Sequence, residues 1–433
     1  MGPRLMNSFF EGDMIKNLFP KGYDLLAGTN QIYELELALG EVEKLTKKEL
    51  LERGAYFWRI DGEETNHFKM CATAPVQVDK RASMRRRTFF EANLFKTGYG
   101  THGLFPYRGK FHPQMIKAIM NITGLKEQDV VLDPMVGSGT TCIEASILGL
   151  DSIGREKSPF GCLMSEAKVF GLTAQIEKIK SYHSEAKNIF NYFHSKKLKN
   201  SLIDFSQEGF TSSVNSPFKD TNYENLFRLC YLDAMGYAKR RKNKKVEELF
   251  PVVLERYVQA IENFAQMKKE LGLRIGKADI KQGDACNLES IKDNTIDGII
   301  TSPPYSFSID YLKNDKPQLE YMGIDVENLR KDMIGLRGKN LEKRVKNYFE
   351  DMDKTMYHMS RVLKSGKSCV IVIGTNTNQL RAILGKEEDI QIERELVKLG
   401  NKHELKIMKQ LIHPIQGIRN VMRDEYILFF RKE

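Results

Sequence analysis

The stretch 129–149, DVVLDPMVGSGTTCIEASILG, decides the fold class of this protein. Its apolar start, which ends at Asp133, predicts a buried strand. Gly137 and Gly139 then predict a tight turn, and the residues after them predict a helix. The next segment, DSIGREKSP, predicts a second strand that ends in an acid, Glu156. Strand, glycine turn, helix and strand in this order form the β-α-β unit of nucleotide-binding sheets.

The C-terminal half of the chain returns to the same pattern. Apolar runs predict strands within 278–288 (ADIKQGDACNL), 295–305 (TIDGIITSPPY) and 368–376 (SCVIVIGTN). A last pair of strands is predicted within 403–415 and 424–433. We therefore predict the α/β class, with a doubly wound, Rossmann-like sheet.

The pattern and composition of the sequence divide the chain into three regions. Residues 1–100 mix helix and strand signals and are interpreted as an N-terminal α+β extension. Residues 101–165 and 276–433 carry the sheet pattern and are predicted to form one domain. Residues 166–275 are strongly charged and mainly helical in pattern, so they are interpreted as a helical insert.

Composition and charge narrow the class of protein. The chain has 433 residues and a formal net charge of +10, which favours nucleic acid over a membrane surface as partner. No apolar run approaches the ~20 residues that span a bilayer, and the first residues lack a signal-peptide pattern. No Cys-x-x-Cys pair occurs and the eight histidines are dispersed, so we expect no metal site. We expect a cytoplasmic protein with reduced thiols at Cys71, Cys142, Cys162, Cys230, Cys286 and Cys369.

The glycine turn suits neither a dinucleotide nor a nucleoside triphosphate. It lacks the third glycine of G-x-G-x-x-G and the lysine of a P-loop. Asp133 could instead accept hydrogen bonds from an ammonium group, and Glu156 could hold the two hydroxyls of a ribose. Asp284, which follows a later strand, could accept from an adenine amino group. An amino acid joined to adenosine is S-adenosylmethionine, so we expect this ligand.

The corner 301–305, TSPPY, presents acceptors at the end of a buried strand. Pro303 and Pro304 fix their φ angles and remove two N–H donors. The Ser302 side chain and backbone carbonyls can therefore hold the two hydrogens of an exocyclic amino group. Tyr305 offers a flat face on which a base can stack. A base inside a duplex cannot reach such a pocket, so DNA would have to be flipped.

Three motifs together resemble a known family. TSPPY resembles motif IV of the amino-methyltransferases that act on nucleic acid, LDPMVGSGTT resembles their motif I, and KFHPQM at 110–115 is similar to their motif X. The chain thus looks like a site-specific DNA methyltransferase over roughly 105–165 and 276–375. Two departures are Met135, where the family often has Phe, and motif IV after motif I, an order that many cytosine-N4 enzymes reverse.

The resemblance implies a function and a set of site residues. Serine before Pro-Pro-Tyr is typical of enzymes that methylate cytosine N4 in duplex DNA with S-adenosylmethionine, often beside a restriction endonuclease. The implied catalytic residues are Ser302, Pro303, Pro304 and Tyr305. The implied cofactor-binding residues are Phe111, His112, Pro113, Asp133, Pro134, Gly137, Gly139, Thr140, Glu156, Asp284, Ala285 and Thr301.

Two basic clusters are candidate phosphate contacts. One includes Arg85, Arg86 and Arg87, and the other, in the insert, includes Lys239, Arg240 and Arg241. Either cluster could equally be a solvated surface. The insert is also the candidate target-recognition region. Residues 308–323 and 329–338 could line a DNA cleft or pack on the insert, and the sequence favours neither.

Other enzyme classes stay open. An RNA (tRNA) guanine-N2 methyltransferase also carries motif I before motif IV, although its motif IV usually begins with Asp or Asn. A DNA adenine-N6 methyltransferase is the next alternative. The absence of a Pro-Cys pair argues against cytosine-C5 chemistry. A non-catalytic nucleic-acid-binding protein is disfavoured because the motif residues are intact.

Overall fold

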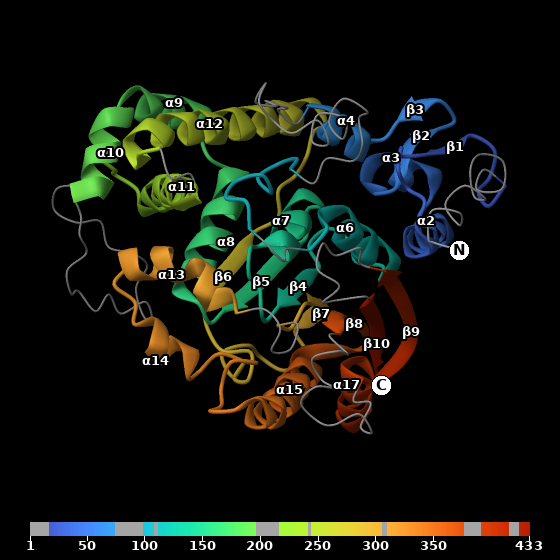
Figure 1. Ribbon diagram of the computed structural model, residues 1–433. Coiled ribbons are helices and arrows are strands. Elements are labelled where there is room, and N and C mark those ends of the chain that lie inside the picture. Colours follow the sequence, from blue (N-terminus) through green and yellow to red (C-terminus); the bar gives the residue numbers. More distant parts are fainter. Residues whose placement is uncertain are drawn as a thin grey trace, which may run out of the picture.

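A computed structural model of the chain describes residues 17–73, 98–107, 111–195, 216–240, 244–304, 310–375, 391–414 and 424–433. Its centre is a seven-stranded sheet with strand order β6-β5-β4-β7-β8-β10-β9 (Figure 1). The strands are β4 (Val130–Asp133), β5 (Asp151–Glu156), β6 (Ala278–Gln282), β7 (Ile296–Thr301), β8 (Leu363–Thr375), β9 (Leu405–Pro414) and β10 (Asp424–Lys432). The predicted α/β class and Rossmann-like sheet are confirmed.

The order of the strands reverses at the middle of the sheet. β6, β5, β4, β7 and β8 run parallel, and β10 runs antiparallel to both β8 and β9. From β4 the chain first adds β5 and β6 on one side, then β7 and β8 on the other. Leu132 of β4 pairs with Ile299 of β7. The glycine turn and the Pro-Pro corner therefore leave the sheet at the same edge, where doubly wound folds bind ligands.

Helices cover both faces of the sheet. They include α6 (Pro113–Ile122), α7 (Thr140–Ile147), α15 (Leu341–Val362) and α17 (Ile392–Lys402). Neighbouring residues of β7 point to opposite faces. Ile300 packs in a core cluster with Ile119 of α6, whereas Ile299 packs in another with Met352 of α15. All six residues of β7 are buried, as expected for a strand with neighbours on both sides and helices on both faces.

A group of helices lies between β5 and β6 in sequence. They are α8 (Pro159–Gly171), α9 (Ile176–Ser184), α10 (Ala186–Ser195), α11 (Thr221–Arg240) and α12 (Val246–Glu270). After the corner come α13 (Tyr311–Tyr321) and α14 (Val326–Arg330). Leu312 and Leu319 of α13 share one core cluster with Phe227 of α11 and Leu254 of α12. The segment after the corner therefore packs on these helices, which was one of its two expected roles (Figure 1).

The N-terminal part forms a small α+β layer beside α6. Its elements are β1 (Tyr23–Leu25), α2 (Ile32–Lys44), α3 (Lys47–Arg53), β2 (Phe57–Ile60), β3 (Glu63–Glu64) and α4 (Asn66–Thr73). Glu41 of α2 is buried and accepts hydrogen bonds from the Ala55 N–H at 2.9 Å and from Asn121 Nδ2 of α6 at 2.6 Å. These bonds join the layer to α6. Among the helices that the structure describes, none combines the length and the apolar character needed to cross a membrane.

Candidate active site

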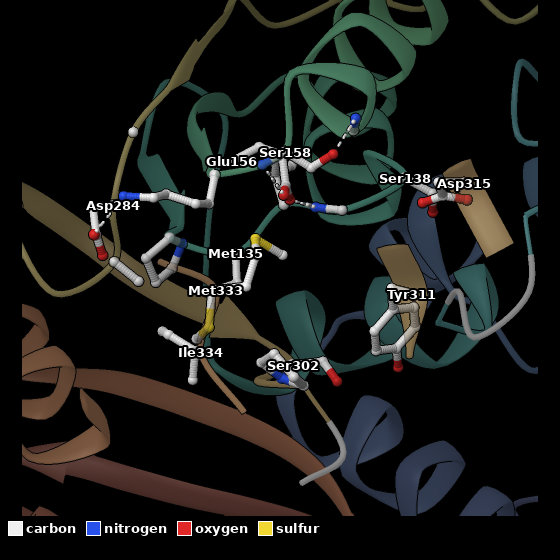
Figure 2. A pocket seen from close by; sticks show the side chains of 18 of the residues that line it. Met135, Ser138, Glu156, Ser158, Asp284, Ser302, Tyr311, Asp315, Met333 and Ile334 are labelled. Carbon is white, nitrogen blue, oxygen red and sulfur yellow. Dashed lines mark hydrogen bonds and ion pairs between the residues drawn. The ribbon is translucent and has the colours of Figure 1, made fainter. Parts of the chain in front are cut away.

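A cavity lies at the carboxyl edge of the parallel strands (Figure 2). Its wall comes from the turn after β4, from the ends of β5 and β6, and from the Pro-Pro corner after β7. Tyr107, Phe111, the start of α13 and residues 332–334 complete the wall. Of the residues expected to bind ligand, those that line the cavity are Phe111, Pro134, Gly137, Thr140, Glu156, Asp284, Ala285, Ser302 and Pro304.

Gly137 and Gly139 of the turn have different structural roles. Both adopt left-handed φ angles, +52° at Gly137 and +86° at Gly139. A Cβ atom on Gly139 would lie 3.1 Å from Ser165 Cα, so this glycine allows the turn to pack closely on α8. A Cβ atom on Gly137 would meet no neighbouring atom closer than Met135 O at 3.8 Å, although Gly137 lines the cavity. Gly137 therefore keeps that part of the cavity clear for a ligand.

Glu156 is held rigidly at the end of β5. Its Oε2 accepts from the Gly137 N–H at 2.8 Å, and its Oε1 accepts from the Ser158 N–H at 2.9 Å. A carboxylate has about four acceptor positions, so two remain for ligand hydroxyls. Burial raises the pKa of Glu156 above its ordinary value. The carboxylate is thus oriented by backbone groups and faces a ligand space without a cationic partner among the described residues.

Asp133 has a supporting position behind the wall. It is only 1% exposed and does not line the cavity. Its Oδ1 accepts from Thr301 Oγ1 at 2.7 Å and from the Met135 N–H at 3.1 Å. Burial raises its pKa to about 6. These bonds tie the glycine turn to the end of β7, whereas we expected Asp133 to bind an ammonium group directly. His112, Pro113, Gly139, Thr301 and Pro303 likewise stand outside the cavity lining.

Asp284 marks one end of the cavity, beside Ala285. Its Oδ1 accepts from the Cys286 N–H at 2.9 Å, and its Oδ2 accepts from Lys157 Nζ at 3.0 Å. Burial raises its pKa, but the Cys286 N–H and the Lys157 ammonium outweigh this effect and lower the pKa overall. Asp284 is therefore ionised at neutral pH. Sequence reasoning did not foresee the partner Lys157, which also lines the cavity.

The Pro-Pro corner reaches the cavity through Ser302 and Pro304. Ser302 is half-buried and lies across the cavity from Glu156 and Ser158 in Figure 2. Pro303 is buried behind them. The expected stacking residue, Tyr305, lies outside the described residues. The glycine turn and the corner thus meet at one cavity, as their positions at the same sheet edge required.

The expected phosphate contacts lie mostly outside the described residues. This applies to Arg85, Arg86, Arg87 and Arg241, and to the side chain of Arg240. Lys239, near the end of α11, is exposed and lines a second pocket next to the cavity.

Sequence reasoning named none of the three residues that form the wall between the two pockets. Tyr107, Tyr311 and Asp315 line both spaces. The Tyr107 hydroxyl donates to Asp315 Oδ2 at 3.1 Å. Burial raises the pKa of Asp315 to about 7. The only signal was that the segment after the corner contains acids and amides, and this signal did not single out Asp315.

Comparisons with known proteins identify the type of domain. A family model described as "RMKL-like, methyltransferase domain" matches residues 104–209, which include the glycine turn and Glu156. The chain carries a methyltransferase domain. S-adenosylmethionine is the methyl donor expected for such a domain.

Curated relatives extend the similarity along the chain. The Type II methyltransferase M.MjaII of Methanocaldococcus jannaschii is 22% identical, over 82% of this chain and 91% of that protein. M.BsoBI of Geobacillus stearothermophilus is 24% identical over 62% of each chain. A tRNA (guanine(10)-N2)-dimethyltransferase of M. jannaschii is 31% identical, but over 22% of this chain and 31% of that protein.

The solved structures that match this chain have low sequence identity to it. A SAM-dependent methyltransferase of Methanosarcina mazei is 12% identical, with a TM-score of 0.32, and the match covers 71% of this chain and 94% of that one. The rRNA methyltransferase aviRa of Streptomyces viridochromogenes is 10% identical, with a TM-score of 0.33, over 75% and 87% of the two chains.

The cavity suits the methyl donor chemically. A Cβ atom on Gly137 would meet no described atom closer than Met135 O, and Glu156 has acceptor positions left for two ribose hydroxyls. The donor carries a positive charge on its sulfur and another on its ammonium group. Glu156 and Asp315 line the cavity as carboxyl groups whose pKa burial raises, so a cationic ligand is electrostatically favoured there.

Proposed function

We propose that this protein is a DNA methyltransferase that methylates the exocyclic N4 atom of cytosine at specific sites in duplex DNA. The observation that carries the proposal is the single cavity lined by both the glycine turn and the Ser302–Pro304 corner. The Type II name of the M. jannaschii relative, which matches 82% of this chain, supports DNA as the substrate. Serine at position 302 supports cytosine N4 over adenine N6, because that residue type marks the cytosine-N4 enzymes it resembles.

In this proposal the cavity holds the donor along its length. Asp284 and Ala285 lie at the adenine end, Glu156 accepts from the ribose hydroxyls, and Phe111 with the turn 137–140 surrounds the methionine part. When bound, the donor supplies a methyl group on a positively charged sulfur. Backbone N–H groups already orient Glu156, so little ordering remains to be done on binding.

The corner would position the target amine. The Ser302 hydroxyl and the corner's backbone carbonyls accept the two N–H groups of cytosine N4 and direct its lone pair toward the methyl group. The nitrogen then displaces the sulfur in line and afterwards loses a proton to solvent. Because two prolines hold this corner rigid, the acceptors need no rearrangement at the moment of reaction. The target base reaches them only after it leaves the duplex.

The surface near α11 would contact the DNA backbone. Lys239 borders the pocket beside the cavity, and Arg240, Arg241 and Arg85–Arg87 complete the proposed set of phosphate contacts. The region 166–275 is proposed to read the target sequence, while 101–165 with 276–433 performs catalysis and 1–100 supports nucleic-acid binding. A partner restriction endonuclease and a cytoplasmic location belong to the same proposal.

A second candidate is a tRNA guanine-N2 methyltransferase. It is favoured by one observation, the 31% identity to the tRNA (guanine(10)-N2)-dimethyltransferase of M. jannaschii over 109 residues. Labelled methyl transfer to duplex DNA and to tRNA, measured side by side, separates the two substrates. Hydrolysis of the product to nucleosides then distinguishes N4-methylcytosine from N6-methyladenine. Methylated tRNA with unmodified DNA would overturn the main proposal.

Substitution of Ser302 tests the role of the corner. Ser302→Ala removes one acceptor of the amine, and we expect kcat to fall roughly 10- to 100-fold. The dissociation constant of S-adenosylhomocysteine, measured by calorimetry, should change less than about twofold, because the substitution affects only the group that holds the methyl-accepting base. Ser302→Thr keeps the hydroxyl and should retain more activity than the alanine variant. Wild-type turnover in Ser302→Ala would show that the hydroxyl has no such role.

A further inference from the structure

Asp315 is a buried carboxyl group that faces the cavity, and no described residue gives it a cationic partner. It is 7% exposed, and it lies on α13, whose apolar residues pack on the helices between β5 and β6. Its one hydrogen bond among the described residues comes from the Tyr107 hydroxyl, at 3.1 Å to Oδ2. A neutral phenol cannot balance a negative charge, so a buried carboxylate here is electrostatically incomplete.

The other acids of the cavity differ from Asp315. Asp284 is paired with the Lys157 ammonium at 3.0 Å, and Asp332 is exposed to solvent. Both oxygens of Glu156 accept backbone N–H groups. Asp133 is occupied by Thr301 and by the Met135 N–H behind the wall. Asp315 therefore stands out as the buried acid on the wall that a cationic group of a ligand would complete.

The position of Asp315 indicates which group of the donor it faces. Asp284 and Asp315 lie at opposite ends of the cavity in Figure 2, with Glu156 between them. If adenine lies beside Asp284 and ribose beside Glu156, the amino-acid part of the donor extends toward Asp315. That part carries a positively charged α-ammonium group.

We propose that Asp315, oriented by Tyr107, binds the α-ammonium group of the methyl donor. The proposal rests on the donor orientation given under the proposed function, but not on the identity of the methylated base. It gives Asp315 the role expected for Asp133 from the sequence. The Tyr107 hydroxyl holds one carboxylate oxygen and leaves the other for the ligand.

Calorimetric titration without nucleic acid tests the proposal. The probes are S-adenosylhomocysteine and its deaminated analogue, 4-(5′-adenosylthio)butyrate, which lacks only the ammonium group. Wild-type protein should bind S-adenosylhomocysteine about tenfold or more tightly than the analogue, because charge-assisted hydrogen bonds are the strong ones. Asp315→Asn should abolish most of this preference by weakening S-adenosylhomocysteine binding alone. The matched control, Asp332→Asn, alters an exposed acid of the same cavity and should keep the preference.

Other results for the Asp315→Asn variant would overturn the proposal. An Asp315→Asn variant that retains the preference, or that weakens both probes equally, would show that Asp315 does not contact the ammonium group. Tyr107→Phe should reduce the preference only in part, since the carboxylate remains but loses its orienting bond. Unchanged affinities together with a lower kcat in Asp315→Asn would instead assign the residue to the methyl acceptor. If wild-type protein bound neither probe, the donor site of the proposed function would fail as well.

Discussion

At the scale of single residues, the site depends on how each carboxyl group is partnered. Asp284 has an ammonium partner, Glu156 has two backbone N–H donors, and Asp133 has a hydroxyl and a backbone N–H. Among the described residues, Asp315 has only the phenol of Tyr107 as a partner. All four acids lie at or behind the wall of one cavity, yet their partners give them different roles.

The protonation state of Asp315 leads to a pH prediction. Burial raises its pKa to about 7, so the carboxyl group is ionised above that pH and neutral below it. Only the ionised form attracts an ammonium group strongly. We expect the preference for S-adenosylhomocysteine over its deaminated analogue to fall roughly tenfold between pH 8 and pH 6.

The ratio of the affinities for S-adenosylhomocysteine and its deaminated analogue isolates the effect of Asp315 protonation. In the proposed binding mode, Glu156, whose pKa burial also raises, contacts the ribose that both ligands share, so the direct effect of its protonation on binding cancels in the ratio. The other titratable and charged groups near Asp315 are Tyr107, Tyr311, Lys239 and Lys313. The preference should be independent of pH in Asp315→Asn, and a pH-independent preference in the wild type would contradict the prediction.

At the scale of elements, the glycine turn joins β4, α7 and α8. Gly139 precedes α7 with a left-handed φ and lies directly against Ser165 of α8. The turn is therefore positioned by packing as well as by its own conformation. Any side chain at this position would push α7 away from α8 and move the cavity wall.

Two alanine substitutions separate these contributions. Gly62→Ala meets the same left-handed φ, +87°, in open space, so it should cost roughly 1–2 kcal/mol of unfolding free energy. Gly139→Ala adds contacts at 3.1 Å to Ser165, so its cost should be larger by at least about 1 kcal/mol. Urea denaturation of both variants measures the difference. Equal costs would show that close packing of the turn on α8 contributes little.

At the scale of the whole molecule, the helices between β5 and β6 are coupled to the active site through α13. One face of α13 packs in their core, and Tyr311 and Asp315 line the cavity. Lys239 of α11 lies beside the same pocket wall. In the proposed function, a nucleic acid bound along these helices would thus lie next to the methyl-transfer site.

Salt dependence tests Lys239 as a phosphate contact. Lys239→Ala should weaken duplex DNA binding and reduce the slope of log K against log salt by about 1, since one fewer counterion is released. Lys406→Ala is the control, because Lys406 is an exposed lysine on β9, at the other edge of the sheet from β6. Fluorescence anisotropy at several salt concentrations gives both slopes. An unchanged slope in Lys239→Ala would remove this residue from the interface.

The local sequence was sufficient to predict the strands and the glycine turn. It was also sufficient to predict that this turn and the Pro-Pro corner lie at the same edge of the sheet. Apolar periodicity, the two glycines and the double proline are each local signals, contained within a few neighbouring residues. The rule that ligands bind where a doubly wound sheet reverses then brings 134–140 and 301–304 together. Glu156 and Asp284 could be predicted for the same reason, since each follows the end of a parallel strand.

Partners that are distant in the chain required the folded molecule. Tyr107 and Asp315 are 208 residues apart, and Lys157 and Asp284 are 127 apart, yet each pair forms a hydrogen bond. Their contact depends on how α13 packs on α11 and how β5 pairs with β6, and neither arrangement leaves a local signature. Burial and neighbouring groups decide the role of a carboxylate. The sequence could therefore identify Asp133 as an acid at the site. Only the packing of the folded chain shows that Asp315 is the carboxyl group that faces the cavity.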